Sequence, residues 1–164
     1  MPKRNNSGGF KKLEGKIKRA LSDDMLKNAL DFVAYIQANG MTIDVVTTVF
    51  SYLGKEVCCL TLDGNSHPAG PWSIYWMTFD IYEQDDFKVD EQLKKFALDH
   101  IHFCSTGHCD NSPGKPRTIF GNKYDNVCYC SLHFKTPDAE ALEKIKKLVE
   151  LRKHNIITER KRTE

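Results

Sequence analysis

The chain contains 164 residues, of which 40% are hydrophobic and 28% are charged, and its formal net charge is +2. A chain of this length builds one domain with its own core, and this composition excludes a mostly disordered, collagen-like or coiled-coil protein. Its apolar runs are far shorter than the roughly 20 residues of a membrane helix. The basic start lacks the apolar segment of a secretory signal. We therefore expect a cytoplasmic protein that does not associate with membranes.

Two helices are predicted before the first strand. Residues 1–9 are polar and rich in glycine and serine, so we expect a flexible start. Apolar residues at helical spacing predict a first helix over 10–21 and a second over 23–39. Ser22 is typical of an N-cap, and Gly40 of the left-handed residue that ends a helix.

The middle of the chain has the composition of β-strands. Val, Ile and Thr are frequent over 42–50, and a hairpin loop at 51–55 leads into a second strand over 56–62. A third strand is predicted over 72–82 after a turn rich in proline and glycine. Both faces of this strand are apolar, which indicates a strand that is covered on both sides or central in the sheet.

The second half of the chain is predicted to contain, in order, an acidic segment over 83–90, a helix over 90–101, a loop over 102–116, a hairpin with strands at 118–120 and 126–134, and a helix over 137–152. Thr136 and Pro137 are typical of the N-cap and first position of that last helix. Residues 155–164 are expected to form a flexible charged tail. The order of elements predicts a single α+β domain over 10–154, with helices packed on a mostly antiparallel sheet of four or five strands.

The six cysteines are the strongest chemical signal in the sequence. Without an export signal, reduced thiols are expected. Cys104 and Cys109 share a loop, while Cys128 and Cys130 alternate along a predicted strand and so share a face. These four thiols are candidate ligands of a tetrahedral zinc ion. Buried structural thiols or one reactive thiol remain alternatives.

Other cysteines and histidines are weaker candidates. Cys58 and Cys59 are adjacent in a strand, so they point to opposite faces and are expected to fill the core. Four histidines are spare zinc ligands if one cysteine is not used: His100, His102, His108 and His133.

Two further sets of residues are candidate ligand-binding positions. Trp72 and Trp76 lie on one face of the third strand, where they line either a ligand pocket or the core. Lys115 and Arg117 make the region after Pro113-Gly114 cationic and suited to an anion. This region is not a phosphate-binding loop, because its Gly-Lys pair lacks the preceding glycine and the following Ser or Thr.

Known functional signatures are missing elsewhere. Lysines and arginines gather over 1–21 and 160–162, but no DNA-binding or RNA-binding motif accompanies them, so no sequence-specific nucleic-acid binding is expected. The motifs HExxH, GxSxG and GxGxxG are absent from the sequence.

Several short motifs of the second half resemble those of a family of small, functionally uncharacterised bacterial proteins. They are SPGK at 112–115, IFG at 119–121, YDNVC at 124–128, PDAE at 137–140 and LVELRK at 148–153. The resemblance covers roughly the last half of the chain and implies a cytoplasmic bacterial protein, without implying an activity. Cys104, Cys109 and Cys128 match thiols of the family, whereas Asn111 replaces a frequent cysteine.

We therefore expect a non-enzymatic binding or regulatory domain that carries a Cys-rich zinc site and takes a small molecule or a protein as partner. A small enzyme that uses a thiol or zinc in the loop over 102–117 remains the alternative.

Overall fold

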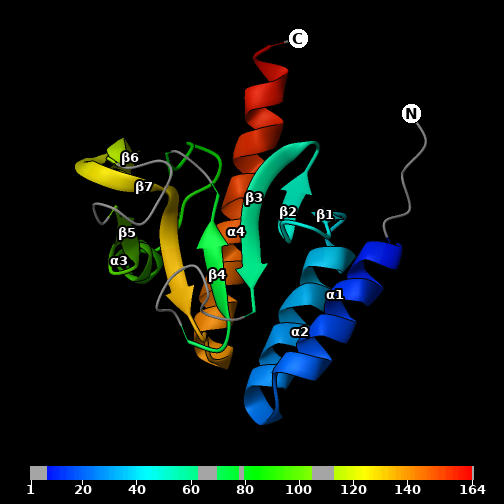
Figure 1. Ribbon diagram of the computed structural model, residues 1–164. Helices are drawn as coiled ribbons and strands as arrows, with labels where there is room; N and C mark the ends of the chain where they lie inside the picture. The colour runs from blue at the N-terminus through cyan, green and yellow to red at the C-terminus, as the bar shows by residue number, and fades with distance from the viewer. Residues whose placement is uncertain (1–6, 63–69, 78–79, 105–112, 164) are drawn as a thin grey trace.

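A computed structural model describes residues 7–62, 70–77, 80–104 and 113–163 (Figure 1). Over these residues the chain forms four helices and seven strands. In order they are α1 (Ser7–Ala20), α2 (Asp23–Ala38), β1 (Thr42–Asp44), β2 (Val49–Tyr52), β3 (Lys55–Thr61), β4 (Ser73–Trp76), α3 (Glu91–Leu98), β5 (Ile101–Phe103), β6 (Lys115–Ile119), β7 (Asn122–Lys135) and α4 (Ala139–Lys161). The predicted α+β class and single domain are confirmed.

The strands form one antiparallel sheet in the order β1-β2-β3-β4-β7-β5, and β6 pairs with the first half of β7. Its seven strands exceed the four or five predicted, for two reasons. The predicted strand over 42–50 is divided by a turn, in which the Asp44 carboxylate accepts hydrogen bonds from the N–H groups of Val46 and Thr47. In addition, Ile101–Phe103 forms β5 where a loop was predicted.

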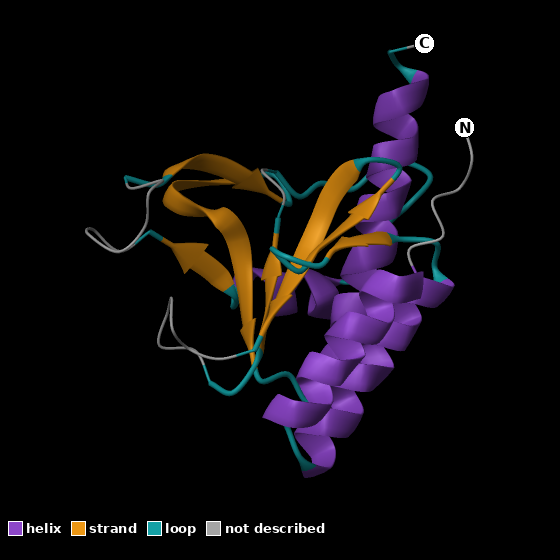
Figure 2. Ribbon diagram, turned by 45° about the vertical axis from the view of Figure 1, so that its right-hand side comes forward, coloured by secondary structure: helices purple, strands orange, loops and turns teal. Residues whose placement is uncertain are grey.

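The helices gather on one side of the sheet (Figure 2). Phe32 of α2 contacts Phe50 of β2, with ring centroids 6.2 Å apart, and Phe10 of α1 stacks on the same ring. The apolar stripe of α4 is buried in the same core, as predicted. On the sheet side, the core takes every second residue of the central strands: Ile74 and Trp76 of β4, and Leu132 and Phe134 of β7.

Three helix ends of α1 and α4 differ from the prediction. α1 begins at Ser7, so the start expected to be flexible over 1–9 is helical from that residue onward. α4 begins after Asp138, whose carboxylate accepts from the Ala141 N–H, and not after Thr136. It continues through Lys161, so most of the expected tail over 155–164 is helical, because Ile156 and Asn155 are buried against the domain.

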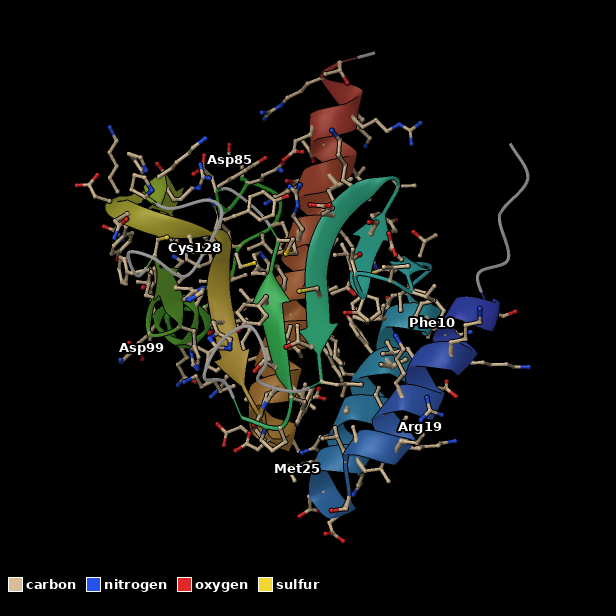
Figure 3. The ribbon with its side chains drawn as sticks, viewed as in Figure 1. Phe10, Arg19, Met25, Asp85, Asp99 and Cys128 are labelled. Carbon is tan, nitrogen blue, oxygen red and sulfur yellow. The ribbon has the colours of Figure 1, made fainter. Side chains whose placement is uncertain are left out.

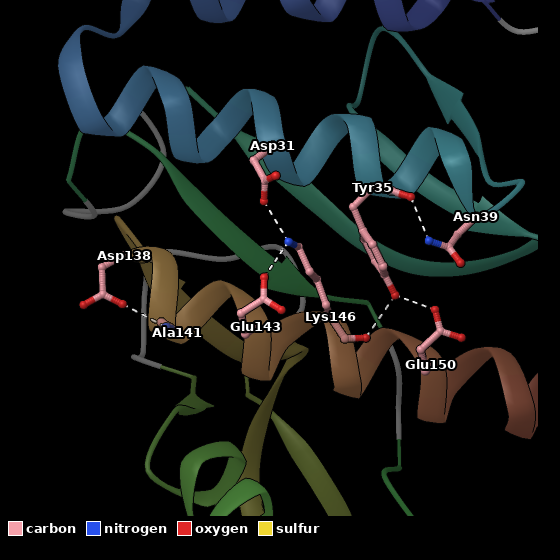
Figure 4. Close-up of polar contacts among 8 residues, drawn as sticks. All are labelled: Asp31, Tyr35, Asn39, Asp138, Ala141, Glu143, Lys146 and Glu150. Carbon is pink, nitrogen blue, oxygen red and sulfur yellow. Dashed lines mark hydrogen bonds and ion pairs between the residues drawn. The ribbon is translucent and has the colours of Figure 1, made fainter.

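Polar side chains join α4 to α2 along one seam (Figure 4). The Tyr35 hydroxyl of α2 donates to the Glu150 carboxylate over 2.5 Å. The Lys146 ammonium lies 2.7 Å from both the Asp31 and the Glu143 carboxylates. These contacts fix the rotation of α4, and with it the direction of the side chains on its last turns.

Among the residues that the structure describes, no helix is both long enough and apolar enough to cross a membrane.

Candidate functional site

The sheet face away from α4 carries a row of side chains with chemical function. Cys59, Tyr75 and His133 are in register on three adjacent strands. Their chain neighbours face the helices, so these three side chains share the opposite face. The rings of Tyr75 and His133 stack with centroids 4.1 Å apart, and His102 of β5 lies 5.4 Å from His133.

Thiols lie in this row and near it. Burial first, and then the nearby Cys130, Cys59 and Cys128, raise the pKa of Tyr75 to about 12. The thiol of Cys130 also contacts the thioether of Met77, with the two sulfur atoms 3.5 Å apart.

The stretch of β7 that contains Cys128 and Cys130 pairs irregularly with β5. Ile101 of β5 pairs with Leu132, and Phe103 pairs with Val127. An advance of five residues along β7 therefore lies opposite an advance of only two residues along β5. Such an excess makes a strand bulge and redirects its side chains. Cys128 lies in this stretch, between Val127 and Leu132 (Figure 3).

The buried thiols are poor nucleophiles. Burial raises the pKa of Cys59 to about 12 and that of Cys58 well above its ordinary value. A thiol attacks only as its thiolate, so both remain protonated and unreactive at neutral pH. They point to opposite faces of β3, as predicted, because Cys58 pairs with Trp76 and Cys59 with Tyr75.

The four predicted zinc ligands are only partly placed. The backbone N–H of Cys104 donates to the Asn126 carbonyl over 2.8 Å, and the Asn126 amide donates back to the Cys104 carbonyl over 2.9 Å. Cys104 thus lies beside the strand that carries Cys128 and Cys130. Cys109 and the spare ligand His108 lie outside the described residues. Within the described ranges, no three His, Cys, Asp or Glu side chains are arranged to hold a metal ion.

The predicted ligand-binding residues lie in two different environments. Trp72 and Trp76 are fully buried in the core, and the small cavity beside Trp76 has a volume of about 10 Å³, close to the minimum that one water molecule needs. Lys115 is exposed on β6, while Arg117 is half-buried two residues further along.

A charged cleft that the sequence analysis missed lies where β3 begins and where β4 and α4 end. It has a volume of about 520 Å³. Its lining residues are Gly54, Lys55, Glu56, Met77, Asp80, Tyr82, Arg152 and Glu159. These positions are scattered over more than 100 residues and match no motif. The charges of Arg152 and Glu159 belong to a segment whose pattern predicts a solvated surface.

Hydrogen bonds hold the acidic side chains of this cleft. The Glu159 carboxylate accepts from the Tyr82 hydroxyl at 2.7 Å and pairs with the Arg152 guanidinium at 2.9 Å. Burial, followed by this bond to Glu159, raises the pKa of Tyr82 to about 12. The Glu56 carboxylate accepts from the Tyr129 hydroxyl at 2.7 Å.

Asp80 is held in the same way. Its carboxylate accepts from the Thr118 backbone N–H of β6 at 2.8 Å. All three carboxylates of the cleft therefore keep a defined direction, although they come from separate parts of the chain.

Comparisons with known protein families, with curated proteins and with solved structures found no match to this chain.

Proposed function

We propose that this chain is a non-enzymatic binding domain and that its ligand is a small polar molecule with a cationic amino or guanidino group. The observation that carries the proposal is the cleft of about 520 Å³, whose lining includes three carboxylates, on Glu56, Asp80 and Glu159. Clefts of roughly 300–1,000 Å³ are the usual size of small-molecule sites.

The charge balance of the cleft favours a cation. Lys55 and Arg152 are its two cationic residues, so the three carboxylates leave an excess of one negative charge. Arg152 already pairs with Glu159. A ligand ammonium group would replace part of the water around the carboxylates with charge-assisted hydrogen bonds.

The fixed carboxylates add to the affinity expected for such a ligand. Each of them accepts a hydrogen bond from a neighbouring strand, loop or helix. A site whose polar groups are already oriented loses less conformational entropy when a ligand binds.

Thermal unfolding with small probes tests this proposal. We expect putrescine or agmatine to raise the unfolding temperature in a saturable way, because a ligand at 100 times its Kd stabilises a protein by about 2.7 kcal/mol. Succinate, a dianion of similar size, should have no effect. The proposal fails if succinate stabilises the protein as well as the amines do, or if neither amine shifts the transition.

Two matched variants on α4 locate the binding. Glu159→Gln should remove the shift that the amine causes. Glu140→Gln should retain it, since Glu140 is also ion-paired, with Lys144, but lies at the other end of the helix. Equal responses of the two variants would place the binding elsewhere on the surface.

A structural zinc ion bound by Cys104, Cys109, Cys128 and Cys130 is a separate proposal. The pairing of Cys104 with Asn126, two residues before Cys128, supports it. Elemental analysis of the purified protein should give one zinc per chain, and substantially less in Cys104→Ser. A zinc content far below one per chain would contradict this proposal.

A further inference from the structure

The surface of α1 carries positive charge that the domain does not neutralise. The helix lies at the outer edge of the molecule, beside α2 (Figure 1). It has five cationic residues and one acidic residue, a net charge of +4 (5 − 1) in a chain whose total is +2. The five are Lys11, Lys12, Lys16, Lys18 and Arg19. Within the described ranges none of them pairs with a carboxylate, whereas several lysines of α4 do.

A groove beside the end of α1 collects two of these cations. It has a volume of about 440 Å³ and lies between α1, the turn before β2 and the end of β3. Its lining residues are Lys16, Arg19, Ala20, Thr48, Leu60, Thr61 and Leu62. Among the lining residues that the structure describes, none is acidic and none is aromatic. The groove therefore differs in charge from the cleft at the end of α4, and the two share no lining residue.

The donors of the groove suit phosphate oxygens. The Arg19 guanidinium is a planar fork that matches two oxygens of one phosphate, and the Lys16 ammonium is a compact charge. The Lys16 ammonium donates to the Val45 carbonyl over 3.4 Å, which keeps it beside the groove and leaves its other donors available. The hydroxyl of Thr61 is a neutral donor in the same groove.

The cations of α1 extend beyond the groove in a row. Lys12, Lys16 and Arg19 follow one another at intervals of four and three residues, so they lie along one side of the helix. All three side chains are exposed. A single anion in the groove leaves Lys12 without a partner, whereas a chain of anions can contact the whole row.

We propose that the row and the groove bind the phosphate backbone of a single-stranded nucleic acid without reading its bases. Successive phosphates of one strand can contact the row, and the narrow backbone can enter the groove. Recognition of the bases is not expected, because the described lining has no aromatic ring on which a base could stack.

An anionic membrane fits these features less well. The apolar residues of α1, Phe10, Leu13 and Ile17, are buried in the core and cannot enter a bilayer as those of an interfacial helix do. A flat layer of headgroups also does not reach the side chains that line a groove.

Fluorescence anisotropy with a labelled oligo(dT) of about 20 nucleotides tests the proposal. The full-length chain is titrated at several salt concentrations. Each phosphate contact on a single strand contributes about −0.7 to the slope of log K against log salt concentration, so three contacts predict a slope of about −2. Oligo(dA) should bind with an affinity within about threefold of that of oligo(dT). A preference of about 100-fold for one base would overturn binding by the backbone alone.

Two double variants with the same loss of charge locate the binding. Lys16→Gln/Arg19→Gln removes both cations of the groove from exposed positions, so the fold is retained. We expect the slope to become shallower by about 1.4 and the affinity at low salt to fall by about tenfold or more. Lys161→Gln/Arg162→Gln removes one lysine and one arginine from the exposed end of α4 and should retain the native slope. Equal losses in the two variants would overturn the proposal, because net charge alone would then explain the binding.

Thr61→Val tests whether the strand enters the groove. Valine keeps the branched shape and is favourable in a strand, but it removes the neutral donor. We expect binding to weaken by about two- to tenfold with an unchanged salt slope, since no charge is lost. An affinity equal to that of the native chain would contradict binding in the groove.

Competition separates nucleic acid from other anions. Polyglutamate and vesicles that contain phosphatidylserine should displace the labelled oligonucleotide much less effectively than unlabelled oligo(dT) at equal concentrations of charge. The proposal is overturned if either competes as well as oligo(dT). Glu159→Gln should bind the oligonucleotide as the native chain does, because Glu159 belongs to the separate cleft.

Discussion

Ser131 is a polar residue that is buried inside the domain. Its side chain is fully buried, and within the described ranges its hydroxyl has no hydrogen-bond partner. A buried hydroxyl without a partner costs about 1–3 kcal/mol. We therefore expect Ser131→Ala to leave the free energy of unfolding unchanged or to raise it by about 1 kcal/mol, as measured by urea denaturation. A loss of stability above about 1 kcal/mol would mean that the hydroxyl has a partner.

Gly114 is required by a close approach of two backbone segments. A Cβ atom at this position would lie 2.6 Å from the carbonyl carbon and oxygen of Asn126. Backbone atoms cannot move aside cheaply, so we expect Gly114→Ala to destabilise the protein by about 1–3 kcal/mol in thermal unfolding.

Gly15 provides the matched control for this substitution. A Cβ atom there meets only the flexible end of Arg19, at 3.6 Å, so Gly15→Ala should stabilise α1 by about 0.5–1 kcal/mol. If both alanine variants had the same effect, the close approach at Gly114 would not be the cause.

At the scale of elements, one phenol makes a strong hydrogen bond across the seam between α2 and α4. Tyr35→Phe keeps the ring packing but removes the hydrogen bond to Glu150. Because the acceptor is a carboxylate, we expect a loss of about 1.5–3 kcal/mol in the free energy of unfolding. Urea denaturation measures it, and a change below about 0.5 kcal/mol would show that water replaces the lost contact.

The helices were predictable and several strands were not, for local reasons. The apolar spacing of 23–39 repeats over many turns, and Gly40 adopts the left-handed conformation expected of it, with φ of +73°. The turn within 42–50 depends on one carboxylate, that of Asp44, and its neighbours are all good strand formers. The three residues of β5 are too few to show a period, and β7 alone orders them.

The whole molecule should lose stability in alkali. The pKa is raised to about 12 for Tyr75, Tyr82 and Cys59 by burial first, and for Tyr129 first by its hydrogen bond to Glu56. In the unfolded chain, tyrosine titrates near about 10 and cysteine near about 8.5. The folded state therefore holds more protons between these values, and stability must fall as pH rises.

This stability is fully present below about pH 8 and is lost as the pH approaches 12. Urea midpoints measured at several pH values from 8 to 11 should fall steadily. A midpoint independent of pH over this range would contradict the raised pKa values.

The chemical character of single residues was easier to predict from the sequence than which of these residues lie close together in the fold. Cys128 and Cys130 were recognised as a pair, but the contact of Cys130 with Met77 joins β7 to the residue after β4 and could not be predicted from spacing along one strand. The charged cleft joins Glu56, Asp80 and Glu159 from three separate parts of the chain. No local sequence pattern predicts that these three side chains lie close together, because their proximity depends on where α4 ends relative to the sheet.

The place of β7 in the sheet has a consequence for how the chain folds. It pairs with β4, β5 and β6. Ser73 of β4 pairs with Lys135, which lies 62 positions later in the sequence (135 − 73). While the protein is being synthesised, β4 therefore lacks one neighbour until residues 132–135 have left the ribosome. Sheets that depend on such distant pairings fold slowly and expose a strand edge meanwhile. Ribosome-bound chains that end before residue 122 should thus be the aggregation-prone species of this protein.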